Sequence, residues 1–123
     1  SADAGSIDDK QSLIDDQYKG KEHFKPIYDL LLKEITTFGN DVEVAPKRAY
    51  VSLRRKKQFA ILQPATQARY EIGINLKGQN PSGKLEAVNK ANAMCSHVIK
   101  IGSESEIDKE VFDWLKKAYE GAG

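Results

Sequence analysis

The most concentrated charge in the sequence is a cationic run over residues 47–57. It holds six of the 19 basic residues and none of the 18 acidic ones. The cations of such a run could bind the phosphates of a polyanion, and the nearby rings of Tyr50 and Phe59 could stack on nucleobases. The alternative is that charged side chains at a hairpin keep it soluble and prevent edge aggregation. The signatures of known RNA-binding sheets are absent. The cations of the run are Lys47, Arg48, Arg54, Arg55, Lys56 and Lys57.

A second pattern with possible chemistry is the pair Cys95 and His97, which would share one face of a strand. A Cys–His nucleophile needs an accessible thiol of low pKa and a third group that orients the imidazole. Glu86, Asn89 or Asn92 could supply that group, but no spacing fixes any of them there. A buried cysteine in a small core is the commoner arrangement. We therefore predict no catalytic residue; enzymatic activity stays open, and a non-enzymatic role is favoured.

The loop over residues 78–84 partly matches a phosphate-binding loop. Gly78, Gly83 and Lys84 have the right spacing, but Leu85 replaces the magnesium-binding hydroxyl and Pro81 removes a backbone donor. A surface loop is the simpler interpretation. One cysteine and two histidines argue against a zinc or histidine-built metal centre. We expect neither a metal nor a cofactor.

Composition narrows the class of protein further. The chain has 123 residues, of which 40% are hydrophobic and 30% charged, with a formal net charge of +1. These values exclude a disordered polymer and a globally basic nucleic-acid coat. No apolar run could cross a membrane and no signal-peptide pattern is present, so we expect a cytoplasmic protein without an internal disulfide. Residues 1–6 fit either a cloning remnant or the cut end of a longer chain.

The elements that must position these residues follow from hydrophobic periodicity. Apolar side chains recur every three or four residues over residues 23–38, which predicts a helix that Gly39 ends. A capped amphipathic helix is predicted over residues 103–121. Residues 85–94 fit a helix or an irregular segment equally well. Strand patterns occupy residues 42–44, 48–54, 57–63, 69–76 and 96–101.

This order predicts an α+β fold, a two-layer sandwich. We expect an antiparallel sheet of four to five strands, with the N- and C-terminal helices on one face. Residues 1–20 are predicted to be a flexible N-terminal segment or linker, and residues 21–123 a single domain.

A hairpin register assigns the two faces of the sheet. If Arg54 pairs with Lys57 and Gln63 with Arg69, one face is almost wholly apolar and must be the core. The opposite face mixes cations, amides and rings, with Phe59 shielding Gly73. Either residues 85–94 cover these rings, or the face is an open binding surface. The predicted core face is Ala49, Val51, Leu53, Ala60, Leu62, Tyr70, Ile72, Ile74 and Leu76. The mixed face is Arg48, Tyr50, Ser52, Arg54, Lys57, Phe59, Ile61, Gln63, Arg69, Glu71 and Asn75.

Four stretches together resemble a bacterial domain family of unknown function: FGNDVEVAPKRAYVSLRRKKQFAILQP, INLKGQNPSGKLE, NAMCSHVIKI and IDKEVFDWLKKAYE. They cover most of the chain from near Gln17 onward. The resemblance implies that the domain follows a short helical domain or ends proteins labelled as predicted transport proteins. It implies no activity that could be carried over.

Three functions stay open. The first is a binding domain whose basic, aromatic sheet face contacts an anionic partner, with nucleic acid as the best single guess. The second is a small-molecule or enzymatic pocket between the sheet and residues 85–97, using Arg69, Asn75, Lys77 and His97. The third is an interaction module for a neighbouring domain or protein, as a monomer or homodimer. The candidate binding residues are Arg48, Tyr50, Arg54, Arg55, Lys56, Lys57, Phe59, Arg69, Asn75, Lys77 and His97.

Overall fold

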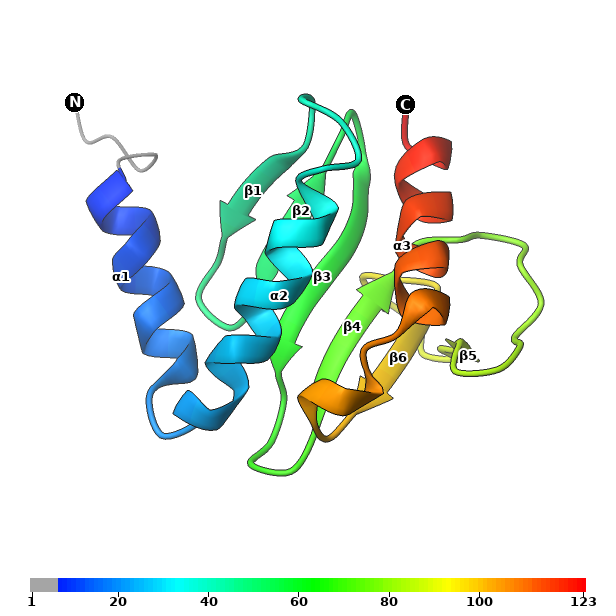
Figure 1. Cartoon of the computed structure of the whole chain (residues 1–123). Helices are drawn as coiled ribbons and strands as arrows, with labels where there is room; N and C mark the ends of the chain where they lie inside the picture. Colours follow the sequence, from blue (N-terminus) through cyan, green and yellow to red (C-terminus); the bar gives the residue numbers. More distant parts are fainter. Residues whose placement is uncertain (1–6) are drawn as a thin grey trace.

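The computed structural model describes residues 7–123, which form helices on one face of an antiparallel sheet (Figure 1). The predicted α+β sandwich is therefore confirmed, with one strand more than expected. The helices are α1 (Ile7–Tyr18), α2 (Lys25–Ile35) and α3 (Lys109–Gly121), with short 3₁₀ turns at Glu22–Phe24 and Glu104–Glu106. The strands are β1 (Glu43–Pro46), β2 (Val51–Arg54), β3 (Gln58–Pro64), β4 (Tyr70–Ile74), β5 (Glu86–Ala87) and β6 (His97–Ile101), in the sheet order β1-β2-β3-β4-β6-β5.

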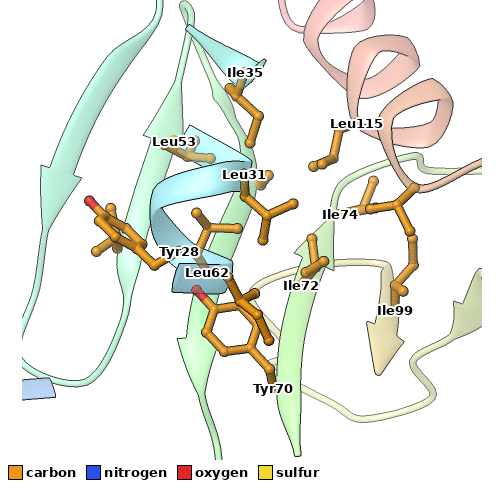
Figure 2. Close-up of a cluster of buried hydrophobic side chains, with 14 of the residues drawn as sticks. Tyr28, Leu31, Ile35, Leu53, Leu62, Tyr70, Ile72, Ile74, Ile99 and Leu115 are labelled. Carbon is orange, nitrogen blue, oxygen red and sulfur yellow. The ribbon is translucent and has the colours of Figure 1, made fainter. Parts of the chain in front are cut away.

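The core lies between the sheet and α2 and α3. The apolar stripe of α2 points at the sheet through Leu31 and Ile35, and α3 adds Leu115 (Figure 2). These side chains meet Leu62 and Ile72 from the two central strands. Each fully buried aliphatic side chain contributes about 1.5–3 kcal/mol of transfer free energy. This packing fixes which face of the sheet is left uncovered by helices.

The predicted assignment of the sheet faces is correct for β2, although its register is not. Ser52 pairs with Ile61 and Ile61 with Gly73, two residues away from the predicted partners. An even shift keeps every side chain on its face. Val51 and Leu53 are accordingly 0% exposed beneath the helices.

Phe59 is the main exception, and its predicted position on the open face is wrong. The register shifts between Leu53 and Arg54, which leaves Phe59 as the extra residue of a β-bulge. Its ring is 1% exposed, belongs to the core, and meets Tyr119 of α3 edge-on at 5.7 Å. Ile61, not Phe59, covers Gly73: a Cβ on this glycine would lie 2.5 Å from Cγ1 of Ile61.

Residues 47–50 form a turn rather than the start of a strand. The amide of Lys47 donates to the carbonyl of Tyr50 (2.8 Å). Arg48 and Ala49, which lie within this turn, are exposed. The predictions that Arg48 faces Gln63 and that Ala49 belongs to the core are therefore wrong.

The N-terminal helix α1 also differs from the prediction, which gave residues 1–20 to a flexible segment. In its described part, Ile14, Gln17 and Tyr18 are buried, and the Tyr18 and Tyr70 hydroxyls are 2.6 Å apart. The Gln17 amide donates to the carbonyls of Lys47 (2.7 Å) and Tyr50 (2.9 Å), which fastens α1 to the β1–β2 turn. The prediction for residues 1–6 lies outside the described residues.

Residues 85–94, for which the sequence predicts either a helix or an irregular segment, are mainly irregular. It supplies the two-residue strand β5 at the edge of the sheet and then runs past Asn92, whose φ is +66°. Cys95 reaches the face of the sheet away from the helices, where its Sγ would lie 3.0 Å from a Cβ on Gly73. This segment is therefore one wall over the otherwise open face.

Candidate functional sites

The six cations of the run over residues 47–57 do not form one patch. Lys47 and Arg48 lie in the β1–β2 turn, whereas residues 54–57 lie at the opposite end of β2, at the β2–β3 turn (Figure 1). With a rise of about 3.3 Å per residue, the two turns are on the order of 20 Å apart. A partner that contacts one group does not automatically contact the other.

Arg55 of the β2–β3 turn contacts two other parts of the fold, the loop before β1 through Asp41 and helix α3 through Tyr119. Its Nε donates to Asp41 Oδ2 (2.9 Å) and its Nη1 to the carbonyl of Tyr119 (3.1 Å), while its guanidinium lies 4.3 Å from the Tyr119 ring centroid. The Tyr119 hydroxyl donates to the other Asp41 oxygen. The bonds from Tyr119 and Arg55 hold the pKa of Asp41 below its usual value, and the same bond to Asp41 raises the pKa of Tyr119. Arg55 thus holds the β2–β3 turn against α3.

Another cation of this turn, Lys57, lines a concave site that we call the lysine hollow. It has a volume of about 610 Å³ and lies between the β2–β3 turn, the loop after β4 and the end of α3. Three lysines from these three segments line it, and none of the acidic residues that the structure describes does. The lining residues are Lys57, Gln58, Phe59, Asn75, Leu76, Lys77, Gly78, Gln79, Lys117, Ala118, Gly121 and Ala122.

Hydrogen bonds fix the loop that carries Lys77. The side chain of Asn75 donates to the Gln58 carbonyl (3.1 Å) and accepts from the Ser96 amide (3.1 Å), so it joins neighbouring strands. The Gln79 side chain accepts from Lys117 Nζ (2.7 Å). The hollow therefore has a braced rim on which the ammonium groups of Lys57 and Lys77 are exposed.

His97 contributes to this bracing rather than to a nucleophilic pair. Its Nε2 lies 2.8 Å from the Gln79 carbonyl, which can only accept, so this nitrogen carries the proton. Its Nδ1 lies 2.7 Å from Ser96 Oγ. Burial raises the pKa of the Cys95 thiol to about 12, which keeps it protonated at neutral pH. Neither residue has the chemistry of an activated Cys–His pair.

A second concave site lies on the sheet face away from the helices; we call it the open-face groove. It has a volume of about 480 Å³. Residues 86–90 and 93–95 line it together with parts of β3, β4 and β6. Arg69 lies here in an ion pair with Glu71 (2.7 Å), and Lys100 lies 3.4 Å from Glu86. The groove thus combines a charged end with an apolar floor.

The structure distributes the predicted binding residues among four places. Lys57, Phe59, Asn75 and Lys77 line the lysine hollow, and Arg54, Arg55 and Lys56 lie beside it in the β2–β3 turn. Arg48 and Tyr50 belong to the distant β1–β2 turn. Arg69 lines the groove, where His97 also reaches from β6. The pocket predicted between the sheet and residues 85–97 therefore holds Arg69 but not Asn75 or Lys77.

Sequence reasoning missed Lys117 and Gln79. Lys117 belongs to the solvent side of a predicted amphipathic helix, where a lysine is ordinary. Only the tertiary placement of the end of α3 next to the β2–β3 turn brings it to Lys57 and Lys77. No local pattern indicates that placement.

Two classes of site receive no support from the described residues. No group of three or more His, Cys, Asp or Glu side chains there could hold a metal ion. None of the helices described is both long and apolar enough to cross a membrane.

Comparison with known proteins gives a family and no activity. Neither the curated proteins nor the solved structures contain a match to this chain. Residues 14–122 match a family described as "Domain of unknown function (DUF5655)". This match covers α2, α3, all six strands and the buried end of α1. The chain therefore belongs to the DUF5655 family.

Proposed function

We propose that this domain binds a polyanion, and specifically nucleic acid, at the lysine hollow and the adjoining β2–β3 turn. The observation that carries the proposal is the lining of the hollow. Lys57, Lys77 and Lys117 come from three separate segments to one concavity, and no acidic side chain of residues 7–123 lines it. Exposed Arg54 and Lys56 extend this surface along the turn.

The balance of charge favours an anion there. Three ammonium groups around one hollow repel each other, and an anion that lies between them relieves this repulsion. The C-terminal end of α3, at Gly121 and Ala122, adds only a fraction of a negative charge. A phosphate brings a full charge and several acceptor oxygens.

The position of Phe59 shapes the proposed mode of binding. Because its ring is buried against Tyr119, a nucleobase cannot stack on it. Tyr50 belongs to the other turn and is half-buried. We therefore expect the contacts to be made with phosphates, and binding to depend strongly on salt and weakly on base sequence.

The expected salt dependence follows from the number of cations. Five phosphate contacts to a single strand give a slope of about −3.5 in a plot of log affinity against log salt concentration. That slope corresponds to a loss of roughly a hundredfold in affinity between 50 and 200 mM salt.

The test is fluorescence anisotropy with labelled 20-nucleotide RNA and DNA at low salt. We compare the chain with a triple variant, Lys57→Gln, Lys77→Gln and Lys117→Gln. The matched control is Lys19→Gln, Lys33→Gln and Lys47→Gln, which removes the same charge from exposed positions elsewhere. We expect the first variant to lose at least tenfold more affinity than the control. Equal losses, or no binding by the unmodified chain, would refute the proposal.

Labelled polyglutamate in the same assay tests an alternative partner. An acidic protein surface, such as that of a neighbouring domain, would offer carboxylates to the same lysines. If polyglutamate binds as tightly as RNA and with the same response to the variants, the partner is an acidic protein. A cytoplasmic location, which the free thiol of Cys95 supports, fits either partner.

A further inference from the structure

The open-face groove has a different composition from the lysine hollow, and the proposed function does not use it. Its floor is a cross-strand row of Ile61, Gly73 and Val98. The next row on the same face places Glu71 beside Lys100, and Glu86 of β5 flanks Val98 at the edge of the apolar row. Since the rows are two residues apart along the strands, an apolar surface lies about 7 Å from a charged one.

The shape of the floor depends on Gly73. Since this residue has no side chain, Ile61 and Cys95 close over it and leave a low floor instead of a ridge. Met94 lines the opposite wall and is 47% exposed, the only large hydrophobic side chain in the described chain with such exposure. A methionine adapts readily to the shape of an apolar ligand.

The charged end of the groove holds more cations than carboxylates. Three cations line the groove, Arg69, Lys90 and Lys100, against two carboxylates, Glu71 and Glu86. Arg69 uses Nε for Glu71, and the described residues provide no hydrogen bond to its two Nη groups. The Lys100–Glu86 pair is long and exposed, so it contributes little stability and can open for a ligand.

We propose that the open-face groove binds a small amphipathic carboxylate. The carboxylate lies at the free Nη groups of Arg69 and at Lys100, and the apolar chain lies on the Ile61–Gly73–Val98 row against Met94. A volume of about 480 Å³ is within the range of small-molecule sites. The sheet is rigid there, because β4 pairs along its whole length with β3 and β6. The inference is independent of anion binding at the lysine hollow.

The probes are hexanoate, octanoate and decanoate below their micelle concentrations, with octanamide as the neutral analogue. Binding to the ¹⁵N-labelled chain is followed by amide chemical shifts. We expect shifts at Gly73, Val98 and residues 86–95, with affinity rising about twofold per methylene. Full burial would give about fourfold, and the groove is half open. Octanamide should bind about tenfold more weakly than octanoate.

Paired variants separate the head-group contact from general adhesion. Arg69→Gln with Lys100→Gln should reduce octanoate affinity to that of octanamide, whereas Glu71→Gln with Glu86→Gln should raise it at least twofold. Lys19→Gln with Lys33→Gln, which removes the same charge elsewhere, should change nothing. Five of the six side chains are exposed, Glu71 is half-buried, and none belongs to the core, so the variants keep the core intact. Equal affinity for octanamide, shifts centred on the helix-covered core, or an unchanged Arg69 and Lys100 variant would overturn the proposal. Oligonucleotide binding by these variants is a separate readout, so either proposal can fail alone.

Discussion

Replacing Phe59 by alanine should destabilise the domain severely while leaving the three lysines of the hollow in place. The ring is 1% exposed and lies in a bulge where it packs edge-on against Tyr119. Its transfer free energy is about 1.5–3 kcal/mol, and the aromatic pair adds about 0.5–1.5 kcal/mol. With the cavity left behind, the expected loss is about 3–5 kcal/mol of unfolding free energy.

Urea denaturation followed by far-UV circular dichroism measures this loss. With a slope of about 2 kcal/mol per molar urea, the midpoint should fall by about 1.5–2.5 M. Phe59→Leu keeps most of the volume and should cost less than half as much. This second variant keeps the test decisive if Phe59→Ala does not fold. At a temperature where it is folded, Phe59→Leu should bind oligonucleotide as the unmodified chain does. A loss below 1 kcal/mol for Phe59→Ala together with weakened binding would refute the assignment of Phe59 to the core.

Three further predictions concern contacts away from the lysines. The pKa of Asp41 is lowered in the folded chain, so its contribution to stability is present above its unfolded pKa and is lost as the pH falls through the lower folded value. Asp41→Asn should therefore flatten the acid limb of a plot of unfolding free energy against pH. An unchanged acid limb would contradict the Asp41–Tyr119–Arg55 contact. Burial raises the pKa of Cys95 to about 12. Its thiol should therefore react with a thiol reagent at pH 8 at least a hundredfold more slowly in the folded chain than in the urea-unfolded chain. Equal rates would show an exposed thiol. Gln17→Ala should cost about 1–3 kcal/mol in chemical denaturation, because two turn carbonyls lose a donor, and a loss below 0.5 kcal/mol would contradict docking of α1.

The faces of the sheet could be predicted because an even error in register leaves every side chain on its face. The predicted hairpins were two residues out of register, yet Val51 and Leu53 are under the helices as expected. The bulge at Phe59 could not be predicted, because no glycine or other local signal marks it. One inserted residue was enough to move the ring from the expected binding face into the core.

The candidate site was only partly predictable for a similar reason. Lys57 stood out because it belongs to the cationic run, and Lys77 was among the predicted binding residues. Their partner Lys117 comes from a helix some forty residues further along the chain, and tertiary packing alone brings the three together. The docking of α1 was not predicted, because its surface is largely polar and acidic and, among the α1 residues whose burial is described, Ile14, Gln17 and Tyr18 are the buried ones.

The measurement closest to the central claim is the slope of log affinity against log salt for a single-stranded oligonucleotide. The unmodified chain should give about −3.5, and the Lys57, Lys77 and Lys117 triple variant about −1.4, since three phosphate contacts are removed at about 0.7 each. The charge-matched control at Lys19, Lys33 and Lys47 should keep a slope near −3.5. Slopes that fall by the same amount in both triple variants would contradict a site at the lysine hollow.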